Sequence, residues 1–400
     1  AMAIRFWSHG RCEDRLGHLM TLSRRGFLGL LGTGVGIASV PPIVGFATGP
    51  TPTASTPTVP NGRIFRSKNG LLRVKLLAAP GTVPVNGVPT ANVQAYNGRV
   101  PGPTIVVSPG DRLKLNFHNQ TTMPSNIHYH GMHVSPKGNQ DNVFIQVPSG
   151  GEFDYDVRIP TDHPGGLYWY HPHWHPNVGP QVWGGMSGLL VVRGGAAALP
   201  ELKDVRKRIM SLRQIAFTPD GVLDLYGAAP AEDQSHLVNG QLMPEVSMRP
   251  GETQLWQLAN IGVNAYYNLE LPGHTFTVVE EDGVQVWQTW ETDKLLFPPG
   301  KRYGFLVTAR KKETLLNLMQ AGYDQGLDKW PAMPIARVRV KGELAKSVKL
   351  PEWIGSKPDW VTGPIRNRRV LTLSQNVVDN QPLFYIDDVL FDNLAMEDIP

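Results

Sequence analysis

A pattern of turns that occurs twice constrains the fold of this chain more than any other feature of its sequence. In the first copy, Asn97-Gly98 is followed by Pro109-Gly110-Asp111 and then by an apolar run. In the second copy, Asn239-Gly240 and Pro250-Gly251-Glu252 stand in the same order before a similar run. Asparagine, glycine and proline at such positions are typical of tight turns between strands. The shared order indicates a duplicated β-domain.

The segments between these turns are typical of β-strands. They are short and rich in β-branched residues, and they end at glycine and proline, of which the 400 residues contain 42 and 35. Examples are residues 71–77, 105–107, 112–117 and 188–192. No long helical period competes with them. The sequence therefore predicts an all-β fold built from tandem β-sandwiches.

The N-terminal segment is typical of an export signal. Ser23-Arg24-Arg25-Gly26-Phe27-Leu28 precedes an apolar stretch that continues to Val44, as in bacterial twin-arginine signals. A buried core helix is the alternative, but the many glycines of this stretch disfavour a stable helix. We therefore expect residues 1–47 to be an upstream extension and a signal peptide, and residues 48–66 to be a linker. The mature protein would be periplasmic or extracellular.

Charge and cysteine content exclude several classes of function. The chain has 38 basic and 34 acidic residues, and removal of the five arginines and two acids of residues 1–47 leaves a net charge near +1. Nucleic acids and anionic membranes are therefore not expected as partners. The only cysteine is Cys12, so the mature part has no disulfide or thiolate ligand. After signal removal no apolar run approaches the ~18 residues of a membrane span. The oligomeric state stays open.

Two histidine pairs, His128-Tyr129-His130 and His171-Pro172-His173, predict a metal site. Side chains on a strand alternate between faces, so both imidazoles of a pair project the same way, with Cβ atoms roughly 6–7 Å apart. Imidazole suits copper, zinc, iron and nickel, and the residues alone do not choose among these metals. The alternative is that the histidines are ordinary polar residues on a strand face.

The segment from Pro101 to Val192 resembles the first cupredoxin domain of the multicopper oxidases. The resemblance rests on Asn126-Ile-His-Tyr-His-Gly131, on Asn139-Gln-Asp-Asn-Val143 and on Gly166-Leu-Tyr-Trp-Tyr-His-Pro-His173. Residues 205–345 resemble the second domain more weakly, through turns and strands without a metal motif. The resemblance implies tandem cupredoxin-like Greek-key sandwiches and copper as the cofactor. It also implies one-electron oxidation of a small-molecule or metal-ion reductant, with reduction of dioxygen to water.

The resemblance also implies roles for individual residues. His128 matches a ligand of type 2 copper, and His130, His171 and His173 match ligands of type 3 copper. Asp141 matches a carboxylate near the cluster that relays protons in some bacterial members; a turn residue is the alternative. His133 and His175 lie close to the motifs and better fit positions beside the ligands than among them.

The chain departs from the family after its second domain. We expect a first sandwich at residues 67–198, a second at 199–346, a connector at 347–367 and the incomplete start of a third sandwich at 368–400. The family's other cluster histidines and its type 1 copper ligands belong to the third domain, and no histidine follows His274. The chain is therefore expected to supply half of a trinuclear copper site and to be inactive alone. A non-catalytic envelope scaffold and a copper-sequestering module are the alternatives.

Overall fold

The protein is described by a computed structural model that covers residues 5–6, 63–218, 221–222, 230–326, 328–350, 352–357, 370–378 and 381–390. Two compact units make up the chain: residues 55–363 form one, and residues 1–54 with 364–400 form the other. The predicted signal motif, Cys12 and most of the predicted linker lie outside the described residues. None of the helices in the described part of the chain is long and apolar enough to cross a membrane.

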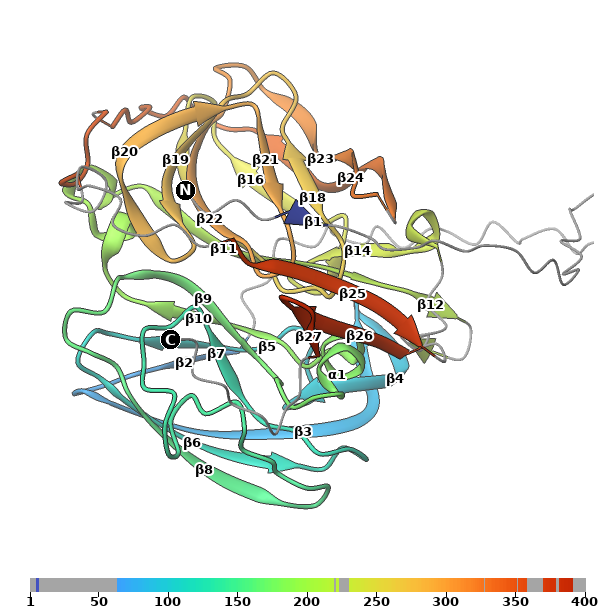
Figure 1. Cartoon of the computed structure of the whole chain (residues 1–400). Coiled ribbons are helices and arrows are strands. Elements are labelled where there is room, and N and C mark those ends of the chain that lie inside the picture. The colour runs from blue at the N-terminus through green and yellow to red at the C-terminus, as the bar shows by residue number, and fades with distance from the viewer. Residues whose placement is uncertain are drawn as a thin grey trace, which may run out of the picture. The chain divides into compact units, whose positions relative to one another are not determined.

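The unit of residues 55–363 begins with a sandwich of two sheets (Figure 1). One sheet has the order β4-β3-β6-β8, with β3 at Leu71–Val85, β4 at Val88–Tyr96, β6 at Arg112–Asn119 and β8 at Glu152–Arg158. The other has the order β2-β5-β10-β9-β7, with β2 at Ile64–Arg66, β5 at Gly102–Val107, β7 at His128–His130, β9 at Gly166–His171 and β10 at Gly188–Val192. Helix α1, Val178–Gly184, connects β9 to β10.

The second sandwich of this unit also has two sheets. Its larger sheet has the order β15-β14-β11-β17-β22-β19-β20, with β11 at Arg206–Ile215, β14 at Ser235–Val238, β15 at Gln241–Leu242, β17 at Thr253–Asn260, β19 at Phe276–Glu281, β20 at Val284–Thr292 and β22 at Arg302–Thr308. Its smaller sheet has the order β16-β24-β23-β18-β21, with β16 at Glu245–Met248, β18 at Tyr267–Glu270, β21 at Lys294–Phe297, β23 at Thr314–Asp324 and β24 at Lys329–Val340.

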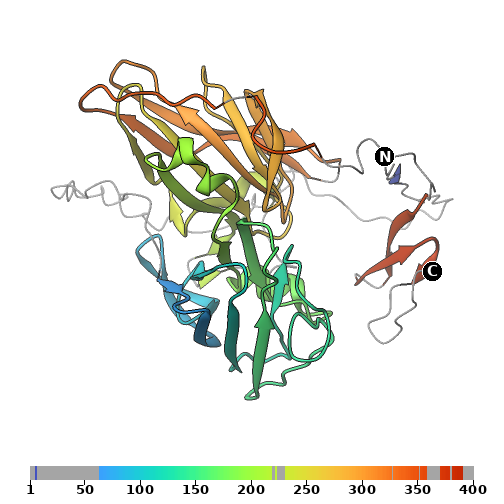
Figure 2. The ribbon, with the colours of Figure 1, turned by 90° about the vertical axis from the view of Figure 1, so that its left-hand side faces the viewer.

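Short elements complete this unit. They are the ribbon of β12, Phe217–Thr218, and β13, Gly221–Val222, and the 3₁₀ helices η1 at Gly195–Ala198, η2 at Pro200–Leu202 and η4 at Ala231–Asp233. In Figure 2 the yellow and orange strands of the second sandwich lie above the blue and green strands of the first.

The two sandwiches repeat the same local structure, as the duplicated turns predict. Asn97-Gly98 and Asn239-Gly240 both have positive φ values, a conformation that these two residue types tolerate better than others. In each copy a central strand of eight residues, β6 or β17, has one parallel and one antiparallel neighbour. The predicted all-β fold of tandem sandwiches is confirmed.

Each sandwich has its own apolar core, and a smaller cluster joins the two. The joining cluster contains Leu167, Trp169 and Leu189 from the first sandwich and Ala259 and Ile261 from the second. One face of the sheet that contains β9 therefore packs on the second sandwich, and its other face packs into the core of the first.

The unit that includes residues 364–400 contains a small sheet of order β1-β25-β26-β27. Strands β25, Thr372–Val378, and β26, Gln381–Ile386, form an antiparallel hairpin, and β27, Val389–Leu390, follows a turn. Strand β1, Arg5–Phe6, pairs in parallel with β25. The expectation that residues 368–400 begin a third sandwich stays a prediction.

Candidate metal centre

Pairing of β7 with β9 brings the two histidine motifs together. The register places His128 opposite His171 and His130 opposite Trp169. Tyr129 and Tyr170, which alternate with these residues, are fully buried in the core of the first sandwich. The strand period therefore directs the tyrosines into the core and the histidines to the opposite face. The strand prediction holds for the first pair, whereas in the second pair His171 ends β9 and His173 lies beyond it.

Ring nitrogens of three histidines lie close together. One ligand atom from each of His128, His130 and His171 lies within 4.8 Å of the others. Nδ1 of His130 and Nε2 of His171 are 3.2 Å apart. The ring of His173 is 5.0 Å from that of His128 between centroids. All four predicted ligands therefore lie in one cluster.

The two other histidines near the motifs have different surroundings. The ring of His175 is 5.7 Å from that of His173. His133 lies beside His163, whose Nε2 accepts a hydrogen bond of 2.9 Å from the backbone N–H of His133. His163 is buried, and its Nδ1 lies 2.8 Å from the carbonyl oxygen of Pro164. Both nitrogens of His163 are thus occupied by the protein backbone.

Hydrogen bonds fix the orientation of the clustered histidines. Nδ1 of His128 is 3.0 Å from Oδ1 of Asp141, and the same oxygen accepts a 2.9 Å hydrogen bond from the N–H of Tyr129. Nδ1 of His171 donates to the carbonyl oxygen of Pro172 at 2.7 Å. Both rings are thus held through Nδ1, which is the usual arrangement of metal-binding histidines, and Nε2 of His171 faces Nδ1 of His130.

Burial favours the neutral form of these imidazoles. It lowers the pKa of His130 to about 3, with smaller effects from the charge of Arg302 and from neighbouring histidines. It lowers the pKa of His173 to about 4 and that of His171 well below its usual value, with repulsion from His128 acting in the same direction. Neutral imidazole has a free nitrogen lone pair, so three of the four rings are ready to bind a metal at neutral pH.

Trp169 lies directly against two histidines of the cluster. Its ring stacks on that of His171 at 4.1 Å and on that of His130 at 4.7 Å, with interplanar angles of 23° and 29°. Trp169 is also buried. The strand period alone could have predicted that Trp169 lies beside the histidines, because a residue two places before His171 projects to the same face of the strand.

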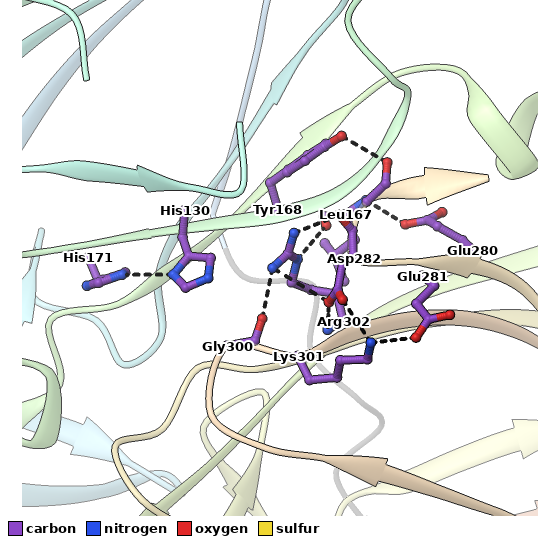
Figure 3. Close-up of polar contacts among 11 residues, drawn as sticks. His130, Leu167, Tyr168, His171, Glu280, Glu281, Asp282, Gly300, Lys301 and Arg302 are labelled. Carbon is purple, nitrogen blue, oxygen red and sulfur yellow. Dashed lines mark hydrogen bonds and ion pairs between the residues drawn. The ribbon is translucent and has the colours of Figure 1, made fainter. Parts of the chain in front are cut away.

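The second sandwich forms part of the wall above the cluster, which the sequence did not indicate. A pocket of about 250 Å³ covers the histidines. The first sandwich lines this pocket with the four histidines, with Trp169 of β9 and with three residues of α1, Val178, Gly179 and Val182. Loops of the second sandwich contribute Gly262, Val263, Pro299 and Gly300. A Cβ atom added to Gly300 would lie 3.0 Å from Cε1 of His130. Figure 3 shows Gly300 and Arg302 on the same side of His130.

This donor set fits copper. Three imidazoles converge with His173 beside them, hydrogen bonds orient His128 and His171, and the pocket next to them is small and partly apolar. Copper(I) and copper(II) both accept imidazole nitrogen as a ligand.

Comparison with known proteins supports the same conclusion. Two family profiles, both described as multicopper oxidase, match residues 78–197 and 211–325. The chain is 26% identical over 323 residues to the multicopper oxidase MmcO of Mycobacterium tuberculosis, covering 72% of this chain and 61% of that protein. It is 31% identical over 256 residues to the iron transport multicopper oxidase fetC of Epichloe festucae, covering 60% of this chain and 39% of that protein.

Solved structures show the same fold at lower sequence identity. A laccase from Pediococcus acidilactici Pa5930 matches with a TM-score of 0.68 and 20% identity, covering 84% of this chain and 71% of that one. The chain spans only 39% to 61% of the length of the two curated relatives above. Copper is the cofactor that this family implies. The two matched domains, the cupredoxin-like fold and the bacterial relatives show that the chain belongs to the multicopper oxidase family.

Proposed function

We propose that this chain is part of a laccase-like oxidase in which His128, His130, His171 and His173 bind copper. The enzyme would oxidise phenolic or metal-ion donors one electron at a time and reduce dioxygen to water. The observation that carries the proposal is the convergence of His128, His130 and His171, whose ligand atoms lie within 4.8 Å of one another. Copper, when bound, would supply the one-electron redox chemistry.

The protein's own contribution would be to hold the ligands in place and to limit access of water. The backbone pairing of β7 and β9 sets the separation of the rings, and Trp169 covers one side of two of them. Asp141 would hold His128 through Oδ1. We also propose that Asp141 exchanges protons with oxygen-derived species in the pocket, because its carboxylate is within hydrogen-bond reach of a ligand.

The four histidines would supply half of a trinuclear copper site. We propose that further histidines and an electron-entry site with a cysteine ligand come from another sandwich domain, on the same polypeptide or on another chain. The Arg24-Arg25 motif supports export to the periplasm or the exterior. The near-neutral charge of the residues after the signal supports a small reductant and dioxygen as partners rather than a nucleic acid.

Copper content of the purified chain tests the proposal. Copper would be measured by mass spectrometry and by electron paramagnetic resonance after loading and desalting, for the wild type and for each of the four histidine-to-alanine variants. His274→Ala is the matched control, since His274 lies in the second sandwich, away from the cluster. We expect bound copper in the wild type and in the control, and a clear loss in each cluster variant.

Other outcomes would decide among the alternatives. A wild-type chain that retains no copper would contradict the proposal and favour a non-catalytic scaffold. Copper that is bound equally well by the wild type and all four cluster variants would also contradict it. Oxygen uptake with a phenolic donor by this chain alone would contradict the proposal that the chain supplies only half of a trinuclear copper site.

A further inference from the structure

Both backbone polar groups of one residue of β9, Leu167, are held by side chains of the second sandwich. The backbone N–H of Leu167 donates to Oε1 of Glu280 at 2.7 Å. The carbonyl oxygen of Leu167 accepts from Nε of Arg302 at 3.2 Å. Figure 3 shows both contacts. Glu280 is fully buried and Arg302 is 4% exposed, so both groups depend on the protein for their hydrogen bonds.

The place of Leu167 in the sheet explains why these partners are needed. Strand β7 pairs with β9 only as far as His130, opposite Trp169. The chain then turns away at Gly131, which has a positive φ of 81°. Leu167 lies two residues before Trp169, so β7 does not reach it, and Glu280 and Arg302 occupy the place of the missing strand. A buried backbone group without a partner would be costly.

Arg302 also connects Leu167 to the turn at Gly300, which lies next to the ring of His130. Its Nη1 donates to the carbonyl oxygen of Gly300 at 2.9 Å, and its Nη2 donates to that of Asp282 at 2.7 Å. Gly300 packs on the ring of His130. A side chain on Gly131 would collide with the guanidinium of Arg302, so this group lies directly against the end of the His128–His130 strand. The planar fork of arginine reaches these three carbonyls from three separate nitrogens, whereas the donors of lysine all lie on a single nitrogen.

We propose that Arg302, assisted by Glu280, is a positioning residue that fixes the imidazoles of His130 and His171 relative to each other. Arg302 acts through three contacts: the peptide at Leu167, from which β9 continues to Trp169 and His171; the turn at Gly300; and the backbone at Gly131. The second sandwich, which contributes no histidine to the cluster, thereby sets the geometry of the site. This inference rests on the proposed copper function of the same histidines.

The experiment compares Arg302→Lys with Arg310→Lys in the full chain. Arg310 is an exposed arginine of the second sandwich that donates to the carbonyl oxygen of Gly273, and it provides the same substitution away from the cluster. Copper(II) affinity would be measured by chelator competition. In addition, the ring nitrogen resonances of ¹⁵N-labelled histidines would be recorded without metal. Glu280→Gln tests the contact with the backbone N–H of Leu167.

We expect Arg302→Lys to lower copper affinity about tenfold, since partners that orient metal ligands typically contribute 10–100-fold. The metal-free resonances of His130 and His171 should shift, while those of His236 should not. Arg310→Lys should leave the affinity and the resonances of the cluster unchanged, and Glu280→Gln should cause smaller shifts of the same two rings.

The two measurements separate this inference from the proposed function. A wild-type chain without copper affinity would refute the function, whereas the metal-free resonances would still test the positioning role. A folded Arg302→Lys protein with unchanged affinity and unchanged ring resonances would overturn the inference. If Arg302→Lys does not fold, unchanged His130 and His171 resonances in Glu280→Gln would overturn it as well.

Discussion

Acid sensitivity provides a test of the structure that is independent of copper, through His236 in the second sandwich. This residue lies on β14 and is 4% exposed. Its Nδ1 is 3.0 Å from the hydroxyl of Tyr267, and its Nε2 is buried without a hydrogen-bond partner among the described residues. The rings of Tyr267 and Trp330 pack against it edge-on. Burial lowers the pKa of His236 to about 4.

The size of the effect follows from the difference between the folded and the unfolded pKa. The unfolded chain binds a proton at His236 near pH 6.5, whereas the folded chain does so only near pH 4. The free energy of unfolding is therefore at its full value above pH 6.5 and falls as the pH decreases toward 4, because the unfolded state binds more protons in this window. When the pH is lowered from 7.5 to 5, the titration of His236 decreases the free energy of unfolding by about 2 kcal/mol.

His236→Asn should remove this loss, because asparagine can keep a hydrogen bond to Tyr267 without titrating. Urea unfolding at pH 7.5 and pH 5 would be compared for the wild type, for His236→Asn and for Val238→Ala. Val238 lies on the same strand and is 1% exposed, so its truncation destabilises the protein without a proton being involved. We expect the decrease in unfolding free energy to be about 2 kcal/mol smaller in His236→Asn than in the other two proteins. An equal decrease in all three proteins would refute the reasoning.

Three substitutions and one removal experiment test the copper site. Trp169→Ala should lower the free energy of unfolding by about 3–5 kcal/mol, measured by urea titration, and should weaken copper binding because two imidazoles lose their stacking partner. Asp141→Asn should lower copper affinity by about 10–100-fold in chelator competition, whereas Asp156→Asn, in a pair with Arg112 on the surface of the first sandwich, should not. Gly300→Ala places a methyl group at a φ of 84° and against the imidazole of His130. The melting temperature of this variant should fall further than that of the control Gly138→Ala, where φ is 62° and the space around the glycine is open. Chelation of bound copper should lower the melting temperature, since a ligand at 100 times its Kd stabilises a protein by about 2.7 kcal/mol; no change would argue against a specific site.

The sequence was sufficient to predict the β-fold and the two separate histidine pairs because both depend on local periodicity. The turns at Asn97-Gly98 and Asn239-Gly240 are determined by residues adjacent in the chain, and so is the strand of His128 and His130. The proximity of the two histidine motifs came instead from the family resemblance. Their register, with His128 opposite His171, depends on a pairing between segments 43 residues apart and could not be read from either segment alone.

The contribution of the second sandwich to the site could not be predicted for a different reason. Glu280 and Arg302 have no spacing or motif that distinguishes them from other charged residues of a β-sandwich. Their role arises because the strand of His128 and His130 stops short of Leu167. The N–H and the carbonyl of Leu167 therefore need hydrogen-bond partners from another part of the chain. Such a requirement becomes visible only when both sandwiches are placed together.

The alternation of Tyr129 and Tyr170 with the histidines limits how this site can change in evolution. Both tyrosines are fully buried opposite each other, while His128 and His171 form the adjacent pair. Insertion or deletion of one residue in either strand would turn a tyrosine toward the metal pocket and an imidazole into the apolar core. A one-residue shift of either strand is therefore not tolerated, because the core face needs apolar or aromatic side chains and the pocket face needs imidazoles. The proposed copper site can therefore vary by substitution, but not by a change in the length of the strands that carry its histidines.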